Sequence, residues 1–182
     1  WIMNGDGSNA KQLTADGGVN DDPMVSPDGR YIVFASNRAG VSNIWRMNAD
    51  GSNPVRLTSG SGEKFPQCSP DGKWVVYNSV ATNQDLFSLW KVPLEGGGPL
   101  RLTESNTDFP AISLDGNRIA YFYRAESTKS GYRIAVIPFE GGQPERTFEV
   151  GQGLDPFTNV GWFPDGQSLT YGAARNGFHN IW

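Results

Sequence analysis

Few residues of this chain have the types and spacing that catalysis or metal binding requires. A serine hydrolase needs a G-x-S-x-G motif and a histidine, but Gly60-Ser61-Gly62 is too short for that motif. His179 is the only histidine and Cys68 the only cysteine, so zinc ligand sets and C-x-x-C pairs are missing. His179 could act as a ligand or a base, although an exposed residue beside a strand explains it better. We therefore predict that the chain is not an enzyme, that it holds no metal or cofactor, and that Cys68 is buried and inert.

Two polar turns, residues 4–9 and 48–53, resemble calcium-binding loops because both are rich in Asn, Asp and Gly. A calcium loop also needs a carboxylate at its twelfth position, which here falls on Ala15 or Ser59. Asn, Asp and Gly are also the residues that a tight hairpin turn demands. We therefore interpret both segments as turns and expect no calcium site in them.

A turn motif in residues 65–77, F-P-Q-C-S-P-D-G-K-W-V-V-Y, organises the elements that would position any functional residue. Pro70 favours the second position of a type I turn, Asp71 can close the turn, and Gly72 accepts a left-handed backbone. Such a turn joins the two strands of a hairpin with a bulge. The residues that follow, from Trp74 to Tyr77, are β-branched or aromatic, as strands prefer. The motif therefore predicts a β-hairpin.

The same signature recurs at residues 26–29, 113–116 and 163–166, and the four turn aspartates are spaced by 43, 44 and 50 residues. A second signature interleaves with it at Trp1, Trp45, Trp90, Ala135 and Trp182. After each of the first four, the centre of a short predicted strand follows 12 residues later. Repeats of about 40–45 residues with four strands each are typical of β-propeller blades, in which we expect the tryptophans to fill the seams.

The fold class predicted is therefore all-β: a single-domain β-propeller segment of about four four-stranded blades. We place outer strands of one blade in residues 1–14, complete blades in 23–58, 66–103 and 110–148, and a partial blade in 160–182. Trp182 occupies the same repeat position as Trp1, so the two ends overlap instead of completing each other. We expect an arc of a larger propeller, completed by further blades or by a second chain.

Charge and hydropathy exclude two classes of partner. The net charge is −4 and the isoelectric point is about 4.9, so the chain carries no electrostatic footprint for nucleic acid. No apolar run approaches the roughly 20 residues of a membrane span. We expect neither nucleic-acid binding nor membrane insertion.

These motifs together resemble the TolB-like, or WD-like, propeller repeat of bacteria. The pattern is an Ile-Trp strand, an Asp-Gly-Ser turn, an Arg-Leu-Thr strand, a Ser-Pro-Asp-Gly turn and an Ile-x-Phe strand. It is met here by residues 43–45, 50–52, 56–58, 66, 69–73 and 26–34. Leu114, Ala135 and Phe163 depart from it, and they predict less regular blades in the last third of the chain.

The resemblance implies three contexts. TolB-like propellers serve as periplasmic scaffolds for protein partners, which implies a periplasmic or otherwise extracytoplasmic location. Similar propellers gate substrate access in serine oligopeptidases, whose catalytic domain would lie outside this chain. Others form the sensor halves of bacterial kinases and regulators. A G-x-S-x-G motif later in a longer protein would favour the peptidase, and the repeat alone does not choose among the three.

Antiparallel geometry separates two faces of the blades. The turns between first and second strands, and between third and fourth, emerge on one face, the turn face. The loops between second and third strands and the crossings between blades emerge on the other, the loop face, where lengths vary. Variable loops on a rigid scaffold usually carry binding specificity. Mixed charge there favours a protein or peptide partner contacted by Asp21, Asp22, Arg38, Glu63, Lys64, Asp85, Asp108, Arg124 and Arg175.

A small-molecule or metal site in the central channel is a further possible function, which would require carboxylates that converge there. We also expect Asn20, Glu63 and Asp108, ahead of the innermost strands, to satisfy backbone groups where blades meet.

Overall fold

The computed structural model describes residues 1–16, 18–80, 87–104, 107–124, 132–150, 159–175 and 178–181. All regular secondary structure within these ranges is β-strand. The strands form four antiparallel sheets, each with its strands in chain order, and this confirms the all-β propeller prediction. The first sheet contains β1 (Asn20–Val25), β2 (Tyr31–Ser36), β3 (Asn43–Asn48) and β4 (Val55–Arg56); the second β5 (Glu63–Cys68), β6 (Trp74–Val80), β7 (Phe87–Pro93) and β8 (Leu100–Arg101); the third β9 (Thr107–Ile112), β10 (Arg118–Arg124), β11 (Tyr132–Pro138) and β12 (Arg146–Glu149); the fourth β13 (Val160–Trp162), β14 (Leu169–Arg175) and β15 (Phe178–Ile181).

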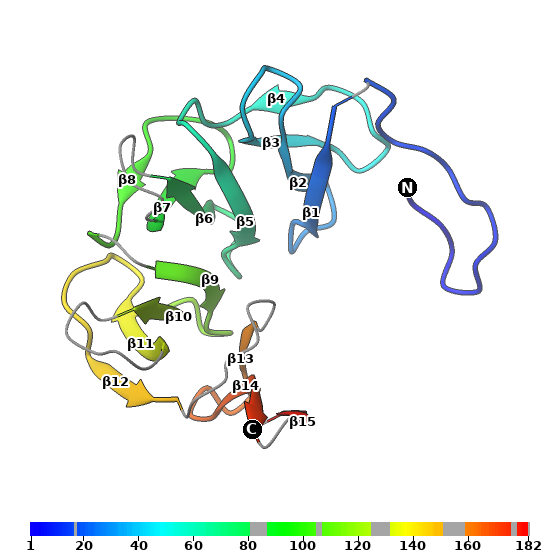
Figure 1. Cartoon of the computed structure of the whole chain (residues 1–182). Helices are drawn as coiled ribbons and strands as arrows, with labels where there is room; N and C mark the ends of the chain where they lie inside the picture. The colour runs from blue at the N-terminus through cyan, green and yellow to red at the C-terminus, as the bar shows by residue number, and fades with distance from the viewer. Residues whose placement is uncertain are drawn as a thin grey trace.

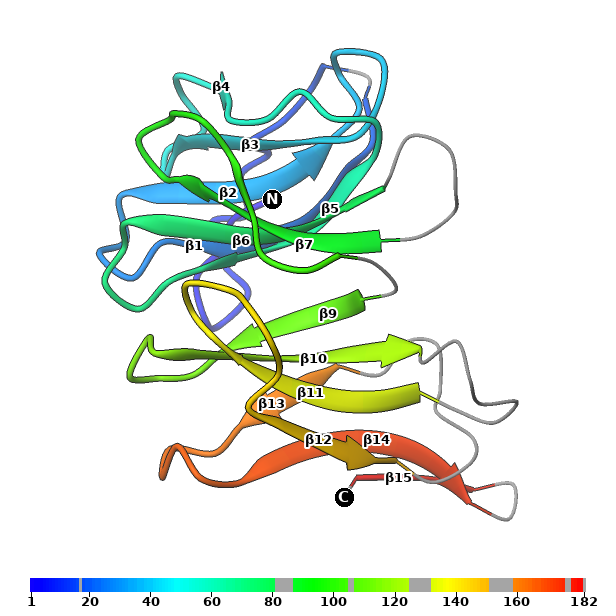
Figure 2. The same ribbon diagram turned by 90° about the vertical axis from the view of Figure 1, so that its left-hand side faces the viewer.

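The four blades follow one another around an arc. Figure 1 shows β1, β5, β9 and β13 on the inner side of the arc and β4, β8 and β12 on the outer side. Figure 2, seen from the side, shows the sheets stacked one upon another with their strands nearly aligned. The first and last blades do not meet in the described part of the chain, so the ring is open, as the overlap of the chain ends predicts.

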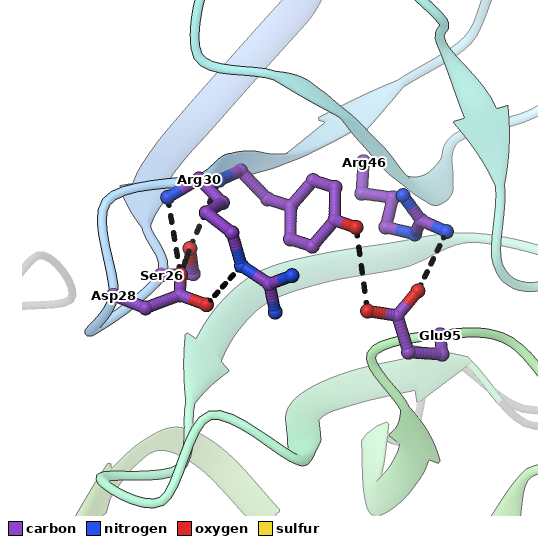
Figure 3. Close-up of polar contacts among 6 residues, drawn as sticks. Ser26, Asp28, Arg30, Arg46 and Glu95 are labelled. Carbon is purple, nitrogen blue, oxygen red and sulfur yellow. Dashed lines mark hydrogen bonds and ion pairs between the residues drawn. The ribbon is translucent and has the colours of Figure 1, made fainter.

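The Ser-Pro-Asp-Gly turns have the geometry that their residues predict. In the first turn the Ser26 hydroxyl donates to Asp28 Oδ1 at 2.7 Å, and the Arg30 N–H donates to the same oxygen at 3.0 Å (Figure 3). Gly29 has a φ of +72°, in the left-handed region that glycine tolerates. The pKa of Asp28 is lowered to about 2 by hydrogen bonds from the Ser26 hydroxyl and from Arg30. Each such turn joins the two inner strands of a blade.

The N-terminal residues form a looser element than two regular outer strands. Ile2 and Lys11 exchange both backbone hydrogen bonds, at 2.9 and 2.8 Å, but this is an isolated bridge. Lys11 Nζ donates to the Asp50 carbonyl at 2.8 Å and so ties the N-terminal segment to the first blade.

Apolar side chains fill the seams between blades. Val33 and Ile44 of the first blade pack with Tyr77 and Val92 of the second, and Trp90 lies against this cluster. The next seam buries Ala135, which stands in the tryptophan position of the third blade. Because β2, β6 and β10 have neighbours on both faces, their residues are almost continuously buried.

A polar contact closes the first seam near the turn face. Glu95, in the turn after β7, accepts hydrogen bonds from Arg46 at 3.0 Å and from the Tyr31 hydroxyl at 3.3 Å (Figure 3). The Arg46 guanidinium carbon also lies 4.4 Å from the centroid of the Tyr31 ring. The first two blades are thus held together near the turn face as well as in their apolar interior.

Candidate functional site

A repeated β-bulge shapes the inner strands. In β1, β5 and β9 the register shifts so that two residues oppose one residue of the neighbouring strand. The residue pairs are Asp22-Pro23, Phe65-Pro66 and Phe109-Pro110, and the first residue of each has a positive φ of 52°, 54° and 49° respectively. This backbone is costly for residues other than glycine, and more so before proline. Such strain persists where the surrounding contacts impose it, as they do here along the axis of the arc.

The bulges meet at a small opening on the inner side of the arc. Its volume is about 160 Å³, and its lining includes Asp22, Phe65, Phe109 and Asn159, which hold the same repeat position in four successive blades. The rings of Phe65 and Phe109 lie with their centroids 4.7 Å apart. The Asp22 carboxylate accepts a hydrogen bond from the Phe65 backbone N–H at 3.2 Å. The spacing of turns and tryptophans does not predict this arrangement, although a proline before each turn, at 23, 66 and 110, marks it.

Charged residues stand beside this opening at its loop-face end. Asp21, Lys64 and Asp108 occupy the same position of β1, β5 and β9, and Asp21 and Lys64 are exposed. Asp108 is half-buried and accepts a hydrogen bond from Asn78 Nδ2 at 3.1 Å. Burial raises the pKa of Asp108 to about 6, while the positive charge of Lys64 acts in the opposite direction. The inner strands therefore present alternating charge, negative, positive and negative, around the arc.

Arg38 lies between the N-terminal segment and the first blade. Its guanidinium pairs with Asp16 at 2.9 Å and donates to Asn20 Oδ1 at 2.8 Å. The guanidinium carbon lies 4.9 Å from the centroid of the Phe34 ring and 5.0 Å from that of Trp45. With only 13% of its side chain exposed, Arg38 joins the N-terminal segment to the first blade.

Glu63 is also buried, at the start of β5. Its carboxylate accepts hydrogen bonds from Asn43 Nδ2 at 2.9 Å, from the Thr58 hydroxyl and from the Gly60 N–H at 3.2 Å. Its backbone N–H donates to the Ser42 carbonyl at 2.8 Å. These contacts tie the second blade to the first.

Two further residues of the predicted partner surface, Arg124 and Arg175, lie in β10 and β14, apart from the inner strands. Arg124 is exposed at the end of β10, and its guanidinium carbon lies 6.0 Å from the centroid of the Tyr132 ring. Arg175 is the last residue of β14. Asp85 lies outside the described residues. The structure thus brings Asp21, Asp22, Lys64 and Asp108 together on adjacent inner strands.

The residues with catalytic or ligand chemistry remain scattered. Burial raises the pKa of the Cys68 thiol to about 11, so the thiol is protonated at neutral pH. His179 lies within β15, opposite Ala174 in the register of β14. Throughout the described ranges, no three His, Cys, Asp or Glu side chains gather closely enough to hold a metal ion. Nor do those ranges include a helix long and apolar enough to cross a membrane.

Comparison with known proteins gives consistent matches. Residues 1–147 match the family described as the TolB beta propeller domain, up to a point within β12. A Tol-Pal system protein TolB from Helicobacter hepaticus is 30% identical over 143 residues, which are 74% of this chain and 34% of that protein. The chain spans 29% and 34% of the length of two curated relatives, so it corresponds to about a third of each.

Solved structures show the same fold. The crystal structure of TolB from Acinetobacter baumannii superposes with a TM-score of 0.76 at 22% identity, over 93% of this chain and 41% of that chain. An acylaminoacyl peptidase superposes with a TM-score of 0.63 at 13% identity, over 91% of this chain and 32% of that one. At these identities the likeness establishes the propeller architecture alone.

Proposed function

The chain belongs to the TolB beta propeller domain family, and from that premise we propose that it is a non-catalytic platform that binds a protein or peptide partner on its loop face. The observation that carries the proposal is the alternating charge of Asp21, Lys64 and Asp108 on three adjacent inner strands. These residues lie beside an opening whose lining includes the neighbouring rings of Phe65 and Phe109. Mixed charge beside a pair of phenylalanine rings suits a protein surface better than a polyanion.

The relatives support this proposal. Two of them are named as TolB proteins of the Tol-Pal system. We propose the same kind of role for this chain, together with the extracytoplasmic location that the resemblance implies. The identity of the partner would follow from the capture experiment below.

A role as the gating propeller of a serine peptidase has weaker support. The acylaminoacyl peptidase shares only 13% identity with this chain, and that supports a common architecture without a common activity. Hydrolysis would require a nucleophile and a base on another domain. Sequencing the complete gene distinguishes the two functions, because a peptidase gene would encode a G-x-S-x-G motif with later Asp and His residues.

Charge reversal on the loop face tests the proposal. Asp21→Lys and Lys64→Glu change exposed side chains, whereas reversal at Asp22 would break its hydrogen bond to Phe65. Each variant would be tagged within the full-length protein and used to capture partners from extracts of the source cells. Lys73→Glu on the turn face is the matched control, because that lysine is also exposed. Captured proteins would be quantified by mass spectrometry.

We expect one captured protein to be recovered in equal amounts by wild type and Lys73→Glu. The two loop-face variants should recover about tenfold less of it, the equivalent of roughly 1.4 kcal/mol of binding free energy. Melting temperatures within about 2 °C of wild type would show that the variants are folded. Equal capture by all four proteins would contradict the proposal.

A further inference from the structure

The first blade contains a built cation site that an internal arginine occupies. The Arg38 guanidinium faces the rings of Phe34 and Trp45, which are paired across β2 and β3. Its Nε donates to Ser36 Oγ at 3.1 Å, and its terminal nitrogen donates to Asn20. An aromatic pair, a hydroxyl, an amide oxygen and the Asp16 carboxylate, 2.9 Å from the guanidinium, thus surround Arg38.

The second blade repeats these surroundings around a cavity of about 410 Å³. Tyr77 and Trp90 are paired across β6 and β7 as Phe34 and Trp45 are across β2 and β3. Both line the cavity, as do Ser79 and Glu63. Ser79 holds the repeat position of Ser36, and Glu63 that of Asn20, since each is the first residue of its inner strand and pairs with that serine.

In the second blade the negative charge comes from Glu63 at the position of Asn20, because Ser59 stands at the repeat position of Asp16, counted back from the inner strand. Glu63 is 3% exposed, and its three hydrogen-bond donors, Asn43, Thr58 and Gly60, are all neutral. No lysine, arginine or histidine within the described residues forms an ion pair with it. A buried carboxylate without a counter-ion is unfavourable, so a cation in the adjoining cavity would be stabilised.

The positive charge of Arg101 does not oppose a cation in this cavity. Arg101 lines the cavity, but its Nε donates to the Thr103 carbonyl at 2.8 Å and its Nη1 lies 3.5 Å from the Glu104 carboxylate. The first blade holds Arg56 in the same register, opposite Trp45, and there it coexists with the Arg38 guanidinium. An arginine at this position whose guanidinium already has hydrogen-bond and ion-pair partners is therefore compatible with a cation nearby.

We propose that the cavity bounded by Glu63, Tyr77 and Trp90 binds the guanidinium group of an arginine side chain displayed by a protein or peptide partner. The carboxylate supplies the opposite charge, the partly exposed Trp90 ring supplies a cation–π contact, and the serine hydroxyls accept hydrogen bonds. A planar guanidinium is preferred to an ammonium because it stacks on aromatic rings and is less strongly hydrated. The inference rests on the proposed function in one respect only, that the arginine belongs to a protein partner.

Nuclear magnetic resonance of the full chain tests the site directly. The ¹⁵N-labelled protein would be titrated with N-acetyl-arginine methylamide and, separately, with the citrulline analogue, which has nearly the same shape without the charge. The indole N–H of Trp90 is the reporter, and its resonance is identified by its absence in Trp90→Phe. A short arginine peptide and methylguanidinium would be titrated in the same way.

We expect a saturable shift of the Trp90 signal with the arginine compound and the arginine peptide, with a dissociation constant on the order of 1 mM. The citrulline compound should leave the signal unchanged, and Glu63→Gln should weaken binding by about tenfold. Glu145→Gln, which removes an exposed carboxylate, is the matched control and should bind as wild type does.

Equal responses to the arginine and citrulline compounds would overturn the proposal, and this comparison requires no variant. Binding of methylguanidinium without binding of the arginine compound or peptide would overturn the assignment to a partner's side chain. The capture experiment on Asp21 and Lys64 is independent of this cavity. Loss of arginine binding would therefore leave the proposed function standing, and equal capture by the loop-face variants would leave the cation site standing.

Discussion

At the scale of single residues, the pKa values of two aspartates are shifted in opposite directions. Asp28 closes a turn through contacts with residues two positions away, so the sequence was sufficient to predict its structural role. Asp108 has the residue type of a surface side chain, but it is half-buried. Its environment is set by Asn78 and Lys64 of the neighbouring blade. No local pattern could have indicated its raised pKa.

Asp28→Asn should lower the melting temperature near neutral pH and remove part of its acid dependence. The folded-state pKa of Asp28 is about 2, below the ordinary 3.8. Its stabilising effect is therefore present above the ordinary pKa and is lost as the pH falls to about 2. Thermal melting across this range would show the two curves converge. A constant difference at every pH would contradict the account.

Asp108→Asn should raise the melting temperature near neutral pH. Because the folded-state pKa of Asp108 is about 6, above the ordinary 3.8, its ionisation destabilises the folded chain at higher pH. Asn keeps the acceptor for Asn78 and carries no charge. The difference from wild type should disappear as the pH falls from about 6 to 3.8. A variant less stable than wild type at neutral pH would indicate that the contact with Lys64 dominates instead.

At the scale of elements, the turns were predictable and the inner bulges were not. Pro70, Asp71 and Gly72 specify their turn by local backbone preferences. The positive φ of Phe65 runs against local preference and is imposed by contacts with the neighbouring blades. Arg38 and Glu63 lie at the loop-face end of their blades, but the ion pair of Arg38 and the burial of Glu63 depend on contacts with neighbouring segments that their charge does not indicate.

Asp22→Val should cost about 1–2 kcal/mol of unfolding free energy, because a β-branched residue at this left-handed position is strained and cannot accept the Phe65 hydrogen bond. Asp22→Asn is the control, since Asn tolerates this backbone and keeps an acceptor. Urea unfolding would measure both. Equal stability of the two variants would argue against the strained bulge.

Leu89→Ala should cost about 2–5 kcal/mol of unfolding free energy, because Leu89 is fully buried in the seam between the second and third blades. Leu114→Ala, at a side chain that is 60% exposed, should change it by less than about 0.5 kcal/mol. Chemical denaturation of both variants provides the comparison. A cost below about 1 kcal/mol for Leu89→Ala would contradict the seam packing.

At the scale of the whole molecule, the repeat determines the architecture. The fixed spacing of turns and tryptophans predicted the blades and the open arc, since each blade is built from local hairpins. The juxtaposition of Asp21, Lys64 and Asp108 depends on how blades stack, which spacing alone does not define. The proposed recognition surface therefore emerges only at this scale.

Site-specific photocrosslinking tests this account most directly. A photoreactive amino acid would replace Lys64 on the loop face or, as the matched position, Lys73 on the turn face of the full-length protein in its source cells. We predict a discrete crosslinked protein from position 64 and none from position 73. The same products from both positions, or a product from position 73 alone, would contradict recognition by the loop face.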